Sequence, residues 1–340
     1  MPGGIQSGEA SGHPARRPGC LPLIQRRRVT MFRGLKALLL TLSLLLCQRA
    51  FADCATTNGT VTLPGSSSFV VYNGQINAQG TAGLNCTGLG LNLLTQNTVT
   101  VKIASTTNNM AVANTDGSGD KIAYLIYPDA NYQYPYSIGQ TIDYSSLNLL
   151  SLILISSNVN FPLYIKTTAG ANVRAGTYTD SINLIWNYHI CGLGVLGLCV
   201  WWDGVDKPST VSVSVTITKD CLIGTAPNVN FGSMALVGQF NPVNQSITLT
   251  CTKTEGYNTY FTNGNNPVSG WRRMKSGTSN FMQYQIYLPN TTTVWDSTNK
   301  QSGAGTGLAQ SIPYKAAVNA AQTEVAVGSY QDTLSFVVEY

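Results

Sequence analysis

Most of the chain after residue 53 consists of short runs in which apolar and polar residues alternate, many of them rich in Val, Ile and Thr. Clear examples are Thr98–Ile103, Val211–Ile217 and Ser246–Cys251. Such alternation places one set of side chains on each face of a strand, and the Gly, Asn and Pro residues between the runs are typical of turns. Helical periodicity is almost absent. The pattern therefore predicts an all-β chain built from sandwiches or barrels.

Two parts of this β-rich region carry the same signals in the same order. Each has two cysteines, then an aromatic strand, then a Gly-Thr/Ser-Tyr-x-Asp signature and directly after it a further strand. The signals are Cys54, Cys86, Ala123–Pro128, Gly176–Asp180 and Ser181–Tyr188 in one part, and Cys221, Cys251, Gln283–Pro289, Gly328–Asp332 and Thr333–Tyr340 in the other. A repeat of this kind indicates two copies of one β unit. We expect an N-terminal domain at 53–218 and a C-terminal domain at 219–340.

The two copies differ after the last strand that they share. The first copy continues to a further alternating strand, Ser209–Thr218, whereas the second has no counterpart to it. An incomplete sandwich exposes a groove and unpaired backbone groups, which a strand from another chain can fill. We expect such a groove in the second domain, with an edge formed by Leu334, Phe336, Val338 and Tyr340. Only Asp53 precedes Cys54 after the leader, so we expect a subunit that receives a strand but donates none, at the end of a polymer.

The first 52 residues have the features of a secretory leader. A positive segment, Met31–Lys36, precedes an apolar run, Ala37–Cys47, and an Ala-x-Ala site at Ala50–Ala52. The run is shorter than the roughly 20 residues that a membrane-spanning helix needs. We expect translation to start at Met31 with a signal peptide over 31–52; a long positive region before residue 31 is the alternative, and both give the same exported protein.

Charge is concentrated in this leader. The chain has 20 Lys and Arg and 15 Asp and Glu, but residues 53–340 contain 12 basic and 14 acidic side chains. Only 10% of all residues are charged, against about 25% in ordinary soluble domains. This composition argues against nucleic acid as a partner and fits an exported β protein.

Six cysteines remain after the leader, an even number that indicates disulfides in an oxidising compartment. Six cysteines allow many pairings, and their spacing favours sequential pairs of Cys54 with Cys86, Cys191 with Cys199, and Cys221 with Cys251. A zinc site is disfavoured because no Cys-x-x-Cys occurs and His189 is the single histidine after the leader. We expect no metal and no cofactor.

Three apolar stretches in the first copy have no counterpart in the second. They are centred on Gly88–Leu94, Ser146–Ile155 and Cys191–Cys199, and a buried strand is the alternative interpretation of such runs. Alternating glycines are poor for a core strand and suit an exposed tip, and large apolar patches mark interaction sites. We therefore expect exposed surface-binding loops formed by Leu89, Leu91, Leu93, Leu94, Leu149, Leu150, Leu152, Ile153, Leu154, Leu193, Val195, Leu196 and Leu198.

Motifs for catalysis are weak. Gly192–Gly197 matches a dinucleotide-binding pattern without the helix that it requires. Asp116–Asp120 resembles a calcium loop without its closing Glu. Asp203 and Asp206 are expected to satisfy turn backbone rather than to hydrolyse glycosides, and His189 is expected to be packed or hydrogen-bonded. We expect no enzyme activity.

The second copy resembles the spore coat protein U domain over residues 221–340. The resemblance rests on Cys221, Asn228–Gly232, Leu249–Cys251, Gly270–Met274, Tyr284–Tyr287 and Gly328–Asp332. The two-domain layout is similar to tip adhesins of archaic (Csu-type) chaperone–usher pili, and the first copy matches more loosely. The resemblance implies an incomplete immunoglobulin-like pilin domain, a periplasmic chaperone, an outer-membrane usher and an adjacent pilin subunit that donates a strand.

Together these features favour a pilus-tip adhesin at the surface of a Gram-negative bacterium, which promotes attachment and biofilm formation by binding apolar surfaces through its loops. The alternative is a carbohydrate-binding, lectin-like tip, in which Trp201, Trp202, Tyr132, Tyr134 and Tyr136 form a platform for sugars.

Overall fold

The computed structural model describes residues 54–86, 98–144, 158–195 and 198–340, and only the backbone for 158–159 and 191–200. Nearly all regular elements are strands; the exceptions among the described residues are a short helix, α2 (Ser68–Asn73), and a 3₁₀ turn, η2 (Val237–Gln239). Residues Ala52–Tyr340 form one compact unit. In the described part of the chain, no helix combines the length and apolar character needed to cross a membrane. The predicted all-β class is confirmed.

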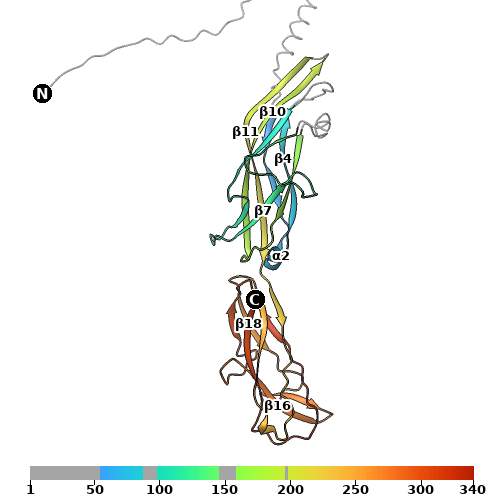
Figure 1. The fold of residues 1–340 in the computed structure, drawn as a ribbon, viewed down its shortest axis with the longest axis vertical. Helices are drawn as coiled ribbons and strands as arrows, with labels where there is room; N and C mark the ends of the chain where they lie inside the picture. Colours follow the sequence, from blue (N-terminus) through green and yellow to red (C-terminus); the bar gives the residue numbers. More distant parts are fainter. Residues whose placement is uncertain (1–53, 87–97, 145–157, 196–197) are drawn as a thin grey trace, which may run out of the picture. The chain divides into compact units, whose positions relative to one another are not determined.

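The first half of this unit is one extended sheet that curls into a nearly closed barrel (Figure 1). Its main path runs β1-β4-β9-β7-β6-β10-β11-β2, with β3 paired to β11, and β5 paired to both β10 and β8. The strands are β1 (Cys54–Thr57), β2 (Gly59–Thr62), β3 (Ser66–Ser67), β4 (Asn77–Cys86), β5 (Thr98–Thr106), β6 (Ala111–Asn114), β7 (Lys121–Tyr127), β8 (Thr141–Asp143), β9 (Asn158–Thr167), β10 (Gly176–Val195) and β11 (Leu198–Thr218).

The second half is a sandwich of two smaller sheets. One has the order β12-β13-β18-β16-β15 and the other β17-β14-β19. The strands are β12 (Cys221–Thr225), β13 (Val243–Cys251), β14 (Gly256–Phe261), β15 (Arg272–Ser276), β16 (Asn280–Tyr287), β17 (Gln301–Ala304), β18 (Gln310–Val318) and β19 (Phe336–Glu339). Each half has its own buried apolar cluster, the first including Trp186 and the second Trp295.

The repeated sequence signals form the same hydrogen bonds in both halves. The signature tyrosine donates its hydroxyl to the carbonyl four residues earlier, from Tyr178 to Arg174 and from Tyr330 to Ala326, each at 2.7 Å. This is the arrangement of a tyrosine corner. The signature aspartate accepts the hydroxyl of the aromatic-strand tyrosine, Asp180 from Tyr124 at 2.8 Å and Asp332 from Tyr284 at 2.7 Å. The two motifs in each copy are therefore joined into one hydrogen-bonded unit.

Two of the three expected disulfides are present, Cys54–Cys86 and Cys221–Cys251. Each joins directly paired residues of neighbouring strands, β1 with β4 and β12 with β13. The side chains of Cys191 and Cys199 lie outside the described residues.

Candidate functional site

The described residues that flank the three apolar segments meet at one end of the first-half sheet. Strand β4 ends where β9 begins, since Asn85 pairs with Asn158. Strand β5 begins beside the outer part of β10, since Thr98 pairs with His189. Strand β8 ends beside β5, since Asp143 pairs with Thr100. All of these residues adjoin a segment with an apolar sequence.

The remaining pairings connect these positions to a common end. At the opposite end, β9 meets β7 through Thr167 and Tyr124. From β7 the ladder passes through β6 to the start of β10, where Asn114 pairs with Tyr178. The start of β9 and the outer part of β10 therefore lie at the same end of the sheet, near the labels β4 and β10 in Figure 1. We call this end of the sheet the loop end.

The predicted surface-binding residues themselves fall on the least described part of the chain. Leu89–Leu94, Leu149–Leu154 and Leu196 lie outside the described residues, and only the backbone is described for Leu193, Val195 and Leu198. That backbone forms the far end of a β-hairpin. Cys191–Val195 and Leu198–Val200 are strands of the β10–β11 hairpin, with Val195 paired to Leu198. Gly194 pairs with Cys199 in this hairpin, and Gly192 lies at a register shift between Cys191 and Leu193.

A stack of buried aromatic rings underlies the loop end. Phe161 lies between Tyr144 and Trp186, with ring centroids 4.1 and 5.0 Å apart. All three side chains are buried, and the Trp186 indole nitrogen donates to the Ser209 hydroxyl at 2.7 Å. Burial also raises the pKa of the Tyr144 hydroxyl, so it stays neutral. These ring contacts pack the residue after β8 against the start of β9, and the start of β9 against the middle of β10.

An exposed polar cluster lies on the hairpin at the same end. The His189 ring stacks on Trp201, with centroids 3.8 Å apart and an interplanar angle of 12°. Its Nδ1 atom hydrogen-bonds the Asp203 carboxylate, whose backbone pairs with His189 across the hairpin. The expectation of a hydrogen-bonded imidazole is confirmed. The expectation that the Asp203 carboxylate satisfies turn backbone is wrong, because the register places it opposite His189.

The tryptophan part of the predicted sugar platform is also wrong. Trp202 is buried, with 7% exposure, whereas its neighbour Trp201 is 37% exposed. Successive side chains of a strand point to opposite faces, so the two rings cannot form one exposed surface.

The predicted platform tyrosines are separated along a loop between β7 and β8. Tyr132 has a positive φ of 53° and makes edge contacts with Tyr127 and Tyr164. Lys166 lies over its ring, 5.2 Å from the centroid. Tyr134 is 82% exposed, while Tyr136 is partly buried against the first-half core. The exposed aromatic surface at this loop is therefore mainly Tyr134.

A second candidate site is a groove of about 710 Å³ in the second half, lined by both apolar and polar residues. Its walls are the segments 229–240 and 324–331, with Phe231 and Met234 on the first wall and Val325 on the second. Met274 and Met282 line it from β15 and β16. Sequence reasoning missed these residues, because neither wall segment shows strand alternation.

The predicted groove-edge residues lie on and beside β19, the strand that follows the second wall in the chain. Phe336 and Val338 belong to β19, and with Leu334 they pack partly buried against the second core. Tyr340 is exposed and donates its hydroxyl to Asp220 at 3.3 Å. Strand β19 is at the end of its sheet: among the described residues it pairs with β14 on one side and with no strand on the other. The matching strand of the first half, β10, pairs with β11.

Comparisons with known proteins agree with this geometry. No curated protein sequence shows a significant match. A similar solved structure is that of the CsuC–CsuE chaperone–tip adhesion subunit pre-assembly complex from archaic chaperone–usher Csu pili of Acinetobacter baumannii. The identity is 26%, the TM-score 0.56, and the match covers 85% of this chain and 100% of that one.

A more distant match is CfaE, the adhesive subunit of CFA/I fimbria of enterotoxigenic Escherichia coli. It is 9% identical, with a TM-score of 0.28 and coverage of 83% and 98%. The Spore Coat Protein U domain family matches the chain twice, over residues 40–184 and 207–336. These two matches span most of the chain and correspond to the two repeated halves. The chain belongs to the Spore Coat Protein U domain family.

Proposed function

We propose that this protein is a pilus adhesin of the chaperone–usher type, which binds apolar surfaces through the three segments at the loop end and is anchored by a strand bound in the second-half groove. The observation that carries the proposal is the common position of the flanking residues. The strand residues that flank three apolar segments from different parts of the sequence lie at one end of the sheet. Apolar surface gathered at one place is typical of an interaction site.

Hydrophobic contact is sufficient to drive such binding. Each Leu or Ile transferred from water to an apolar surface contributes up to about 1.5–3 kcal/mol. Residues 87–97, 145–157 and 191–200 contain no Asp, Glu, Lys, Arg or His, so engaging a surface does not require burying a charge. Several such residues acting together, on many pili of one cell, would give strong attachment by avidity.

Anchoring rests on the one-sided pairing of β19. A strand from another chain that hydrogen-bonds β19 and continues along the preceding segment 324–331 would also place alternate side chains in the groove. Two or three apolar side chains there would contribute about 3–9 kcal/mol before ordering costs. By analogy with the chaperone-bound tip subunit of the similar structure, a periplasmic chaperone would occupy this groove before an adjacent subunit does. An outer-membrane usher would then carry the protein to the cell surface.

Attachment tests the adhesive part of the proposal. Leu93→Asn, Leu152→Asn and Leu196→Asn each place an amide in one apolar segment, and together they should abolish attachment of piliated cells to polystyrene. Leu308→Asn is the matched control, since Leu308 is an exposed leucine of the second half. Loss of attachment in the triple variant alone, with normal piliation, supports the proposal; retained attachment refutes it.

The same assay separates binding to apolar surfaces from the carbohydrate alternative. Mild detergent should release cells bound by hydrophobic contact, and soluble glycans should not. Inhibition by glycans, together with loss of binding in Tyr134→Ala, would instead favour a lectin-like tip.

A peptide tests the groove. A synthetic strand with alternating apolar residues should raise the melting temperature of the purified protein, whereas a peptide of the same composition without alternation should not. Equal effects of the two peptides, or none from either, would contradict strand acceptance at β19.

A further inference from the structure

The two halves are joined by a short connection and by contacts from separate parts of the sequence. The chain passes from β11 to β12 through Lys219 and Asp220 alone. The Asp220 backbone N–H donates to the hydroxyl of Thr252 at 2.9 Å, and that hydroxyl also lies 2.8 Å from the hydroxyl of Ser68 in α2. Both hydroxyl-bearing residues are buried. Lys219 of the link is exposed and Asp220 is half-buried, and the Thr252 hydroxyl connects Asp220 to Ser68 of the first half.

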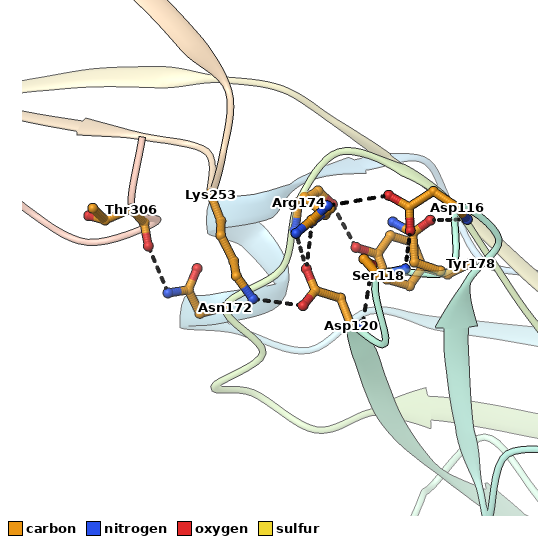
Figure 2. Close-up of polar contacts among 9 residues, drawn as sticks. Asp116, Ser118, Asp120, Asn172, Arg174, Tyr178, Lys253 and Thr306 are labelled. Carbon is orange, nitrogen blue, oxygen red and sulfur yellow. Dashed lines mark hydrogen bonds and ion pairs between the residues drawn. The ribbon is translucent and has the colours of Figure 1, made fainter. Parts of the chain in front are cut away.

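An ion pair lies next to this contact, as Figure 2 shows. Lys253 of the second half reaches Asp120 of the first half, with Nζ 2.7 Å from Oδ1. The other carboxylate oxygen accepts the backbone N–H of Arg174 at 3.0 Å, and the Arg174 side chain lies 3.5 Å away. Only 11% of the Asp120 side chain is exposed. Water and salt screen such a pair less than a surface pair.

The loop that presents Asp120 is itself held in place. Asp116 accepts the Ser118 backbone N–H at 2.7 Å, and the Ser118 hydroxyl accepts that of Asp120 at 3.3 Å. The Arg174 guanidinium lies 3.7 Å from Asp116, and the Ser118 hydrogen bonds hold the pKa of the Asp116 carboxyl below its usual value. The acidic loop that resembles a calcium site in sequence is thus bound by cationic side chains from the two halves.

A third contact joins the halves at Gly307. Asn172 donates its side-chain N–H to the Thr306 carbonyl at 3.0 Å. Gly307 has φ of 76°, and a Cβ there would lie 1.8 Å from the Asn172 amide oxygen. Any other residue would be strained at this positive φ and would displace the Asn172 side chain, so glycine permits this close approach.

We propose that these contacts form an interdomain lock, which holds the loop-bearing half at one fixed orientation to the groove-bearing half. Two segments of the second half, Thr252–Lys253 and Thr306–Gly307, make three contacts with the first half, at Ser68, Asp120 and Asn172. A hinge needs one free connection, and three separated contacts remove the freedom to rotate about it. A force applied at the groove would then reach the loop end without first straightening a flexible joint.

Small-angle X-ray scattering of the full chain after its leader tests the lock. The wild type should fit the single arrangement of the structure at low and high salt. The double variant Lys253→Met with Asn172→Ala should lose that fit and require an ensemble of orientations with a larger radius of gyration. Lys300→Met is the matched control, because Lys300 forms an ion pair with Glu339 inside the second half.

The outcomes distinguish a lock from accidental contacts. Circular dichroism must first show that the double variant keeps the wild-type β content and melting temperature; if it does not, Lys253→Met alone replaces it, because Asp120 then keeps Arg174 as a partner. A wild type that already needs an ensemble overturns the proposal. So does a folded variant that scatters like the wild type. Attachment is not measured, so the result is independent of the proposed adhesive function.

Discussion

The Tyr284–Asp332 hydrogen bond allows a quantitative test of how the repeated signature stabilises each half. Asp332 accepts the Tyr284 hydroxyl at 2.7 Å on one carboxylate oxygen and the Asn265 backbone N–H at 3.0 Å on the other. The Tyr284 ring is buried. Replacing Asp332 with Asn keeps the shape of the side chain but leaves one acceptor oxygen for two donors. Either the Tyr284 hydroxyl or the Asn265 backbone N–H must then face the NH₂ group of the new side chain.

The expected cost can be worked out from these contacts. A hydrogen bond to a charged group contributes about 1.5–3 kcal/mol, and a buried donor left unpaired costs about 1–3 kcal/mol. Asp332→Asn should therefore destabilise the second half by about 2–4 kcal/mol. Tyr284→Phe removes one donor, at a cost of about 1.5 kcal/mol. In the double variant Asp332→Asn with Tyr284→Phe, the amide oxygen can accept the Asn265 N–H and no hydroxyl is left unpaired. The two losses of stability should therefore not add, and we expect a coupling free energy of about 1–2 kcal/mol.

Differential scanning calorimetry and urea unfolding of the four proteins measure this coupling. The first half offers an internal replicate, because Asp180 accepts the Tyr124 hydroxyl at 2.8 Å and two backbone N–H groups at 2.8 and 2.9 Å. The Tyr124→Phe and Asp180→Asn cycle should give coupling of the same sign. If the losses of stability of the two single variants add to within about 0.5 kcal/mol in both halves, the idea that the two motifs form one hydrogen-bonded unit is refuted.

Buried groups give three further expected outcomes. Burial first, and then Asp180 or Asp332, raise the pKa of Tyr124 and Tyr284 above the usual value. The unfolded chain therefore ionises first, and stability measured in urea should fall above about pH 10 by about 1.4 kcal/mol per pH unit for each tyrosine, a slope that Phe variants reduce. Arg272→Met should destabilise the second half by about 3–5 kcal/mol in the same assay, since it leaves buried carbonyls without their hydrogen-bond donor. Gly80→Ala places a Cβ 2.3 Å from a backbone oxygen and should lower the stability of the first half by about 1–3 kcal/mol or more.

Local sequence signals are sufficient for the fold class, the repeat and two disulfide pairs. Alternation is a property of each strand, and Cys54–Cys86 and Cys221–Cys251 join neighbouring strands that the spacing already suggests. The hydrogen bond between the aromatic-strand tyrosine and the signature aspartate is not predictable from such local signals. Tyr284 and Asp332 are 48 residues apart, and nothing in the period of either strand specifies the crossover that brings them together.

The errors at the loop end have a similar cause. Treating Trp201 and Trp202 as one surface neglects strand geometry, which sends adjacent side chains to opposite faces. Once the β10–β11 hairpin is recognised, one ring must be buried, and it is Trp202. The His189–Asp203 contact depends on the register of that hairpin, and a shift by one residue would separate the two side chains.

Comparison of the two halves suggests how the second remains ordered with β19 paired on one side. The first half closes through a continuous sheet, whereas the second has two sheets that share no strand among the described residues. Arg272 joins them. From β15 in one sheet it donates to the carbonyls of Phe261 and Thr262, at the end of β14 in the other, at 2.9 and 2.8 Å.

Arg272 pairs with Tyr284, and the corresponding tyrosine of the first half, Tyr124, donates its backbone N–H to the carbonyl of Met110. The first half therefore has an apolar residue, Met110, at the position that matches Arg272. A buried guanidinium is costly to desolvate, so its place beside β14 is best explained by the bonds that it makes. Strand β14 is the described partner of β19, so bonds that fix β14 would keep the edge of β19 extended for the donor strand that we propose it receives. Loss of these bonds in Arg272→Met should therefore weaken binding of an alternating donor peptide beyond the loss of stability alone. Hydrogen exchange of the β19 amides, compared with those of β13, would show whether the edge loosens first; uniform loosening of both strands would contradict this role for Arg272.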